Sequence, residues 1–540
     1  MKPRALRFAA CIVLLSFFCL RASARQATYH NPVVAGDYPD PSVMRVGDVY
    51  WAATTTGDWA PHFALLRSRD LVNWQKVGYV FQTKPAWAKG DFWAPEIVND
   101  RGRFFVFYVA RRDEGPKKRG TLCVAVATAA APEGPYTDRG PLVCQIPERG
   151  NVGSIDPAFT RDERGQPFLV WKADGNDARP MQPTSVYAQP LSEDGTRLLG
   201  KRKEILRNDA PWEGIAIEGS FILRRGDWFY HFYAGNACCG RACNYAEGVA
   251  RSRHLLGPWE KYARNPIVAA NHDWQCPGHG SIVETQDGRD FLLYHSYRQR
   301  PDTFSVGRES VLDEVKWMAD GWPVVDEGRG PSSVAPSPFG VAGGASDSEF
   351  FDGFVDARLS PEWQWPLGVE QTARVEVAGG GHLVLEPSKA LTGGPASSDG
   401  DTPTGAVVAR RTTSGDYVAT TLVDALGMSA AARAGLAVYG WRDASIGIAA
   451  GGGKITVWRR EGKDERVVAS ADAPKSEAIY LRMTAAGGER YSFAFSANGR
   501  DWTGLGGAVG GGYIEGARVA LTAGGGAARF DWVKITPVKR

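Results

Sequence analysis

Five short motifs recur along the first 330 residues, and each holds one residue that can carry charge or transfer a proton. The motifs are residues 39–42 (PDPS), 93–97 (WAPEI), 154–158 (SIDPA), 217–220 (IEGS) and 278–281 (GHGS). Their ionisable members, separated by 56, 60, 62 and 61 residues, are Asp40, Glu96, Asp156, Glu218 and His279. The flanking residues are mostly apolar, Gly or Pro, so solvation of a polar surface does not explain this pattern. Carboxylates that only cap turns are the structural alternative, which is strongest for Glu96.

Several carboxylates in one site provide the chemistry that splits a glycosidic bond. In the inverting form of this reaction, one carboxylate activates water while a protonated carboxyl donates to the leaving oxygen, with roughly 6.5–9.5 Å between them. A third carboxylate beside the acid raises its pKa, because like charges resist ionising together. The 18 Trp, 18 Tyr and 23 Phe residues fit this chemistry, since the flat apolar faces of sugars stack on aromatic rings.

An aromatic strand follows each motif after a turn, which indicates that the motifs belong to one structural repeat. These strands are expected at residues 49–51, 103–108, 167–171, 227–232 and 290–294. Five repeats of about 60 residues, with several strands each, predict a five-bladed β-propeller. The innermost strand of every blade lines the central channel, so we expect the motif residues to converge on the axis.

The rest of the sequence predicts a second β domain. The 64 Gly and 33 Pro residues, together with the aromatic content, favour an all-β chain with many short strands. We assign residues 27–332 to the propeller and the Pro-, Gly- and Ser-rich residues 333–349 to a linker. Alternating strand patterns over residues 350–540 predict a two-sheet β-sandwich.

The first residues have the pattern of an export signal. A basic start, an apolar run over residues 8–20 and Ala-Ser-Ala at 22–24 predict a signal peptide over residues 1–24. We therefore expect an exported protein, either periplasmic or secreted. Cleavage would remove four of 63 basic residues and none of 60 acidic ones, which leaves 59 against 60. With this balance, and with no other apolar run long enough to span a bilayer, neither nucleic acid nor a membrane is expected as a partner.

Six cysteines remain after the predicted cleavage, and an exported protein permits them to form disulfides. Cys123 and Cys144 are close enough in sequence for a local bridge. The other four form a cluster in which an adjacent Cys238–Cys239 bridge is one option, the remaining members being Cys243 and Cys276. A zinc site is the alternative for this cluster, although the spacing CCxxxC is unusual for zinc ligands.

Taken together, the five motifs and the segment 31–42 (NPVVAGDYPDPS) resemble glycoside hydrolase family 43, in order and spacing, over residues 29–330. The resemblance implies a five-bladed propeller that acts by inversion on xylose- or arabinose-containing polymers. Residues 350–540 resemble the lectin-like sandwich, a concanavalin-like jelly roll, that accompanies some of these enzymes. A plant cell-wall oligosaccharide or polysaccharide is accordingly the expected partner.

The resemblance also implies a role for each matching carboxylate. Asp40 matches the general base, and Glu218 matches the general acid. Asp156 matches the carboxylate that raises the pKa of the acid and orients it. The resemblance implies no cofactor for the chemistry itself.

Three further residues match the family's substrate-binding positions, each with a structural alternative. Trp93 resembles an aromatic wall of the sugar pocket, and packing in the core is the alternative. Arg308, in residues 306–310 (VGRES), resembles an arginine that reaches into the pocket, with a surface salt bridge as the alternative. His279 matches an axial histidine that often organises a structural calcium ion or its waters, and a hydrogen bond to Asp or water is the alternative.

These observations favour an exo-acting enzyme that releases β-D-xylosyl or α-L-arabinofuranosyl units. An endo-1,5-α-L-arabinanase is the alternative within the family, and a non-catalytic carbohydrate-binding propeller is the alternative outside it. A retaining fructosidase fits less well, because its acid motif is Glu-Cys whereas Glu218 precedes Gly219. Residues 236–240 (NACCG) depart from the commonest family members, so the choice of sugar is not transferred from the resemblance.

Overall fold

The computed structural model shows a nearly all-β chain. It describes residues 27–114, 120–144, 152–299, 304–345, 349–368, 371–377, 380–387, 405–440, 444–462, 464–511 and 514–538. The predicted signal peptide lies outside these ranges. In the described ranges, the helical elements are single 3-10 turns: η2 (Gly175–Asp177), η3 (Pro211–Glu213), η4 (Phe304–Val306) and η5 (Asp326–Gly328). Within the described ranges, no helix has the length and apolar character needed to cross a membrane.

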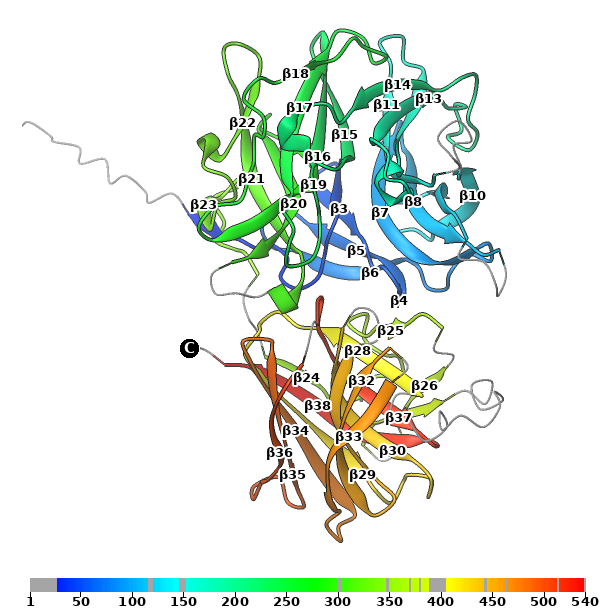
Figure 1. The fold of residues 1–540 in the computed structure, drawn as a ribbon, viewed down its shortest axis with the longest axis vertical. Helices are drawn as coiled ribbons and strands as arrows, with labels where there is room; N and C mark the ends of the chain where they lie inside the picture. Colours follow the sequence, from blue (N-terminus) through cyan, green and yellow to red (C-terminus); the bar gives the residue numbers. More distant parts are fainter. Residues whose placement is uncertain are drawn as a thin grey trace, which may run out of the picture.

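Five antiparallel sheets of four strands each form the propeller in the upper half of Figure 1. From the inner strand outward, blade 1 contains β2 (Ser42–Val46), β3 (Val49–Thr54), β5 (His62–Ser68) and β6 (Gln75–Phe81), and blade 2 contains β7 (Ala88–Asp100), β8 (Arg103–Arg112), β9 (Leu122–Ala129) and β10 (Thr137–Val143). Blade 3 contains β11 (Ser154–Arg161), β12 (Pro167–Ala173), β13 (Ser185–Pro190) and β14 (Lys203–Arg207), and blade 4 contains β15 (Ile217–Arg225), β16 (Trp228–Gly235), β17 (Ala246–Ser252) and β18 (Glu260–Lys261). Blade 5 contains β19 (Trp274–Glu284), β20 (Asp290–Arg298), β21 (Glu309–Trp317) and β22 (Pro323–Val325). The five inner strands contact one another in a closed ring, which confirms the predicted architecture.

A short strand pair joins the two ends of the propeller chain. β1 (Thr28–His30) pairs antiparallel with β23 (Val334–Pro336), which lies within the segment that we predict as a linker. Asn31 strengthens this closure, because its Nδ2 donates to the carbonyls of Leu312 and Ser332 at 2.9 Å each. Blade 5 is thereby fastened against the start of blade 1.

The second domain is a β-sandwich, as predicted. One sheet contains β24 (Phe350–Asp352), β26 (Gln371–Glu376), β27 (His382–Pro387), β29 (Tyr417–Asp424), β34 (Ala478–Ala486), β35 (Arg490–Ser496), β36 (Thr503–Gly510) and β38 (Ala528–Pro537). The other contains β28 (Ala406–Arg411), β30 (Arg433–Tyr439), β31 (Ser445–Gly451), β32 (Lys454–Glu461), β33 (Asp464–Asp472) and β37 (Arg518–Gly524). Buried and partly exposed residues alternate along β29 and β34, and the buried face packs in a core shared by both sheets.

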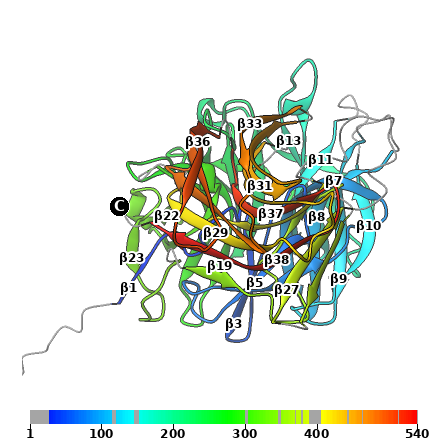
Figure 2. The same ribbon diagram turned by 90° about the horizontal axis from the view of Figure 1, so that it is seen from below.

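The sandwich docks on one end of the propeller, below it in Figure 1 and overlapping it in Figure 2. β4 (Trp59–Ala60) of the propeller pairs with β25 (Trp365–Pro366) of the sandwich. The guanidinium of Arg518 lies 4.2 Å from the ring centroid of Trp59, in a cation–π contact. Ala517 N donates to the carbonyl of Ser305 at 2.7 Å. The sandwich therefore contacts the propeller at β4 and at Ser305, which lies three residues before Arg308.

Three disulfides are formed in the propeller domain. Cys123 pairs with Cys144 within blade 2, and the adjacent Cys238 and Cys239 pair with each other. The third disulfide, Cys243–Cys276, connects the loop after β16 to the inner strand of blade 5.

Candidate active site

In each blade, a residue of the motif has left-handed backbone; it lies in the inner strand or, for Asp40, two residues before it. These residues, with φ of 53°, 48°, 53°, 62° and 50° respectively, are Asp40, Ala94, Asp156, Gly219 and His279. Register shifts accompany four of them, in β7, β11, β15 and β19. Such irregularities redirect side chains, and strained backbone is common at functional sites. In two blades, the left-handed residue is not the ionisable residue of the motif. Glu96 lies two residues after Ala94, and Glu218 lies one residue before Gly219.

Gly219 shows why glycine follows Glu218. A Cβ atom at this position would lie 2.8 Å from the ring of His279, and the positive φ also disfavours a side chain. The backbone N–H of Gly219 donates to Asp156 Oδ2 at 2.9 Å. Glycine therefore lets three inner strands approach closely and holds the carboxylate of Asp156.

Asp40 is buried and surrounded by nitrogen atoms. Its Oδ1 lies 2.9 Å from Arg308 Nη1, 3.1 Å from His295 Nδ1 and 3.5 Å from His279 Nδ1. Burial alone would raise the pKa of Asp40, but Arg308 and His279 outweigh burial and hold this pKa well below its usual range. Asp40 is therefore ionised across the whole physiological pH range, as a general base must be.

Glu218 and Asp156 form the second part of the site. Lys172 Nζ forms an ion pair with Glu218 Oε2, and the hydroxyl of Tyr245 donates to Glu218 Oε1 at 2.9 Å. Burial favours the neutral form of Glu218, but the charge of Lys172 overcomes it and lowers the pKa of Glu218. Burial and the neighbouring Glu218 instead raise the pKa of Asp156 to about 6. The pair thus retains a proton at mildly acidic pH, and in the free protein Asp156 holds it.

His279 and Arg308 both reach the carboxylates of the site. His279 Nδ1 lies between Asp40 Oδ1, at 3.5 Å, and Asp156 Oδ2, at 3.9 Å. Calcium prefers six to eight oxygen ligands. Among the described residues, the one set of three side chains with ligand atoms mutually within 4.8 Å is His382, Asp424 and Asp531 of the sandwich. His279 is not part of this set, and the structural calcium ion that it would organise, directly or through waters, stays a prediction.

Trp93 and Glu96 lie on β7, the inner strand of blade 2, between the blades that carry Asp40 and Asp156. Trp93 is half-buried and packs against a core cluster that includes Ile155, the neighbour of Asp156. Glu96 is 7% exposed, and the hydroxyl of Ser42 donates to its Oε2 at 2.7 Å. Burial raises the pKa of Glu96 to about 8. Glu96 thus joins blades 1 and 2 as a neutral group, through a hydrogen bond between the blades.

Three side chains that were not predicted from the sequence also control the carboxylates. Lys172 is 1% exposed in β12, Tyr245 is 1% exposed beside β17, and His295 is fully buried in β20. Burial lowers the pKa of His295 to about 4, so its imidazole is neutral. Lys172 and His295 each interrupt an apolar strand, and this interruption is the sequence signal that could have revealed them.

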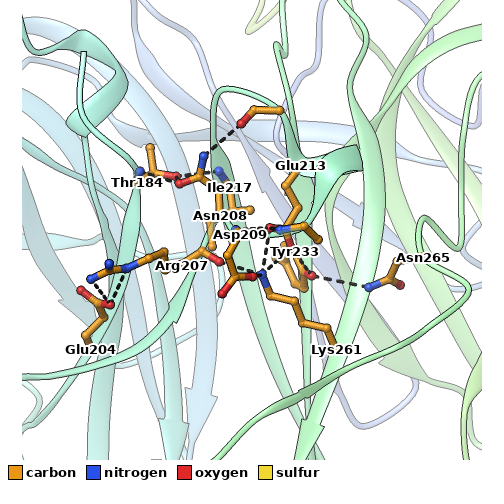
Figure 3. A network of polar contacts seen from close by, with 12 residues as sticks. Thr184, Glu204, Arg207, Asn208, Asp209, Glu213, Ile217, Tyr233, Lys261 and Asn265 are labelled. Carbon is orange, nitrogen blue, oxygen red and sulfur yellow. Dashed lines mark hydrogen bonds and ion pairs between the residues drawn. The ribbon is translucent and has the colours of Figure 1, made fainter. Parts of the chain in front are cut away.

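A polar network fixes the segment that leads into β15 (Figure 3). At its centre, the buried carboxylate of Glu213 accepts hydrogen bonds from two backbone N–H groups of the preceding turn, at 2.8 and 2.9 Å. Lys261 Nζ and the hydroxyl of Tyr233 contact the same carboxylate at 2.7 and 2.8 Å. The backbone N–H of Ile217 donates to Thr184 Oγ1 of blade 3 at 2.7 Å. The backbone of the candidate acid is thus anchored to its own blade and to the preceding one.

The geometry defines a class of protein: a five-bladed propeller with an ionised carboxylate facing a proton-holding carboxyl pair, joined to a lectin-like sandwich. The model of glycosyl hydrolases family 43 matches residues 29–323, and the model of the β-xylosidase C-terminal concanavalin A-like domain matches residues 351–536. The chain belongs to glycosyl hydrolases family 43.

Curated relatives carry names from the same group of enzymes. The chain is 30% identical to a xylan 1,3-β-xylosidase of Vibrio sp. over 62% of its own length and 64% of the relative. It is 30% identical to xylosidase/arabinosidase 43B of Humicola insolens, over 64% and 63% of the two chains. It is 28% identical to the extracellular exo-α-(1→5)-L-arabinofuranosidase ArbA of Cellvibrio japonicus, over 58% and 91%. The chain thus spans less than two thirds of the first two relatives.

Solved structures share the complete two-domain fold. The GH43 protein BlXynB of Bacillus licheniformis superposes with a TM-score of 0.77 at 24% identity, covering 95% of this chain and 100% of BlXynB. The xylan β-1,4-xylosidase of Bacillus halodurans C-125 superposes with a TM-score of 0.75 at 23% identity, covering 94% and 100%.

Proposed function

We propose that the protein is an inverting glycoside hydrolase that releases β-D-xylosyl or α-L-arabinofuranosyl units from plant hemicellulose or arabinan fragments. The observation that carries this proposal is the unequal treatment of the axial carboxyls. Arg308 and His279 keep Asp40 ionised, whereas Asp156 and Glu218 together retain a proton. One site thus offers a base and an acid at the same pH.

In the proposed reaction, Asp40 accepts a proton from the water that attacks the anomeric carbon. Glu218 donates a proton to the glycosidic oxygen as the bond to the leaving group breaks. Asp156 provides this proton to the pair in the free enzyme, and its negative charge then favours the protonated form of Glu218. Arg308 holds Asp40 in place, and Trp93 offers an aromatic face to the sugar.

The choice of sugar rests on the relatives. Those named above include a β-xylosidase, a xylosidase/arabinosidase and an exo-α-L-arabinofuranosidase. A plant cell-wall saccharide with terminal xylose or arabinofuranose is therefore the proposed substrate.

The test compares hydrolysis of aryl β-D-xyloside and aryl α-L-arabinofuranoside by the wild type, Asp40→Asn and Glu218→Gln. We expect activity on at least one substrate, and a loss of about 10²-fold or more in kcat in either variant. Proton NMR of the first product should show the inverted anomer. Undiminished hydrolysis in both variants would refute the assignment, whereas activity on linear arabinan alone would support an endo-acting enzyme.

We also propose that the protein is exported, to the periplasm or the medium, with cleavage after residue 24. The pattern of residues 1–24 supports this proposal, and so does the use of six cysteines in three disulfides. N-terminal sequencing of protein recovered outside the cytoplasm tests it, and an intact Met1 on that protein would contradict it.

A further inference from the structure

The loop between β16 and β17, residues 236–245, ends at the residue that contacts the candidate acid. Its sequence contains the adjacent Cys238 and Cys239, then Cys243, and closes with Tyr245. The proposed reaction assigns no role to this loop, although the loop contains three of the six cysteines that follow residue 24.

The loop is fixed at its first residue. The backbone N–H of Asn236 lies 2.9 Å from the carbonyls of Glu213 and Ala216, in the anchored segment of Figure 3. Within the loop, Ala237 and Asn244 bond reciprocally at 3.1 Å, because each backbone N–H donates to an oxygen of the other residue. The loop is therefore closed on itself before it reaches Tyr245.

The end of the loop is fastened to blade 5. The Cys243–Cys276 disulfide connects it to β19, three residues before His279. Tyr245 is 1% exposed and packs in one cluster with Cys276 and Tyr297. A Cβ atom on Gly278 would lie 2.7 Å from the ring of Tyr245, so the ring fits closely against β19.

Tyr245 in turn reaches both halves of the site. Its hydroxyl donates to Glu218 Oε1 at 2.9 Å. Its ring stacks on His295 with an interplanar angle of 7°, and His295 contacts Asp40. Because Lys172 holds the other oxygen of Glu218, the two contacts together fix the rotation of the carboxyl group.

The same loop contacts the sandwich. Arg241 forms an ion pair with Glu489, and its guanidinium lies 4.9 Å from the ring of Phe304. The backbone N–H of Gly240 donates to the hydroxyl of Tyr297, which bonds to Glu515 of the sandwich. The loop thus lies between the docked sandwich and the acid.

We propose that Tyr245 is a positioning residue for Glu218, and that the Cys243–Cys276 bridge holds Tyr245 in place by fastening the loop to blade 5. This inference rests on the proposed role of Glu218 as the general acid. An acid that rotates freely spends less time aligned with the leaving oxygen, so the loss should appear in kcat more than in KM.

The experiment uses the full chain and three variants: Tyr245→Phe, the pair Cys243→Ser with Cys276→Ser, and their combination. The matched control is the pair Cys123→Ser with Cys144→Ser, which removes a disulfide from blade 2. Tyr245→Phe keeps the packed ring and should lower kcat by about 10-fold, with KM nearly unchanged. It should also move the alkaline limb of the pH profile to higher pH, because a hydrogen bond that stabilises ionised Glu218 is lost.

The pair Cys243→Ser with Cys276→Ser should also lower kcat, whereas the control pair in blade 2 should leave kcat unchanged. If the bridge acts through Tyr245, its loss should add little once the hydroxyl is gone, so the two effects should be non-additive. Additive losses would mean that the bridge acts elsewhere, and an unchanged kcat in Tyr245→Phe would overturn the whole inference. If the serine pair does not fold, reduction and alkylation of the native protein, with the sites mapped by mass spectrometry, replaces it.

Glu218→Gln separates the failure of the proposed function from the failure of this inference. An active Glu218→Gln refutes the proposed function, whereas an inactive one beside an unaffected Tyr245→Phe refutes only this inference.

Discussion

Replacement of Glu96 by Gln distinguishes a structural from a catalytic carboxyl on the propeller axis. Burial raises the pKa of Glu96 from its ordinary 4.5 to about 8, although the hydrogen bond from Ser42 opposes this shift. The folded protein therefore keeps a proton on Glu96 at neutral pH, whereas the unfolded chain loses it above pH 4.5. A carboxyl with a raised folded-state pKa makes the protein less stable as the pH rises from the unfolded to the folded value.

The size of the effect follows from these two pKa values. Each pH unit between them costs about 1.36 kcal/mol, and integration from pH 5 to pH 7 gives a loss of about 2.5 kcal/mol in the free energy of unfolding. Gln is neutral at both pH values and keeps an oxygen that can accept from Ser42. The difference in stability between Glu96→Gln and the wild type should therefore shift by about 2.5 kcal/mol in favour of the variant.

The assay is urea unfolding followed by tryptophan fluorescence at pH 5 and pH 7, with both proteins measured side by side. All other groups titrate alike in the two proteins, so their contributions cancel in the difference. Glu284→Gln, at an exposed residue of β19, is the matched control, because it makes the same substitution at a carboxyl that the fold does not bury. An equal difference in the free energy of unfolding between Glu96→Gln and the wild type at pH 5 and at pH 7 would falsify the reasoning, because it would mean that Glu96 is ionised in the fold. The variant should also keep kcat within about threefold of the wild type, since Glu96 transfers no proton in the proposed reaction.

Three further predictions concern the charges of the site. First, kcat/KM should fall as the pH rises above about 6, because the pair of Asp156 and Glu218 then loses its proton; a profile that is flat from pH 5 to pH 9 would contradict this. Second, Lys172→Met should destabilise the fold by about 3 kcal/mol and move the alkaline limb upward, because a buried ion pair is broken and the pKa of Glu218 rises. The control Lys316→Met, which breaks the exposed pair with Glu327, should change stability by less than about 1 kcal/mol, and equal effects would refute the argument. Third, removal of divalent cations with EGTA should leave kcat unchanged, because carboxyl groups perform both proton transfers of the proposed reaction; a loss that calcium restores would show that an ion organises the axis.

The repeat made the fold predictable from the sequence. A fixed interval between motifs, each followed by an aromatic strand, requires structurally equivalent blades, so Asp40, Asp156 and His279 could be placed on one axis. The exact register was less accessible, because β-bulges shift side chains by one or two positions without changing the spacing of motifs. For this reason Glu96 appeared equivalent to Asp40 although it lies two residues beyond the corresponding turn.

The partners of the carboxylates were not predictable in the same way. Lys172, Tyr245 and His295 lie on or beside second and third strands of their blades, where one polar residue in an apolar strand gives only a weak signal. Which carboxylate such a residue meets depends on how neighbouring blades pack, and no local pattern contains this information. The pairing of Cys243 with Cys276, 33 residues apart, has the same origin.

The closed ring of blades explains why the two parts of the candidate site differ in charge. Asp40 is on blade 1 and receives Arg308 from blade 5, across the point where β1 and β23 close the propeller. Glu218 is on blade 4 and receives Lys172 from blade 3. Each carboxylate therefore obtains its cation from a neighbouring blade, and Lys172 must also serve Asp174, at 3.3 Å. Asp156 forms no direct ion pair with Lys172 and lies beside Glu218, so it becomes the carboxyl that keeps the proton. The difference in charge between Asp40 and the pair of Asp156 and Glu218 is thus a property of the closed ring rather than of any single blade.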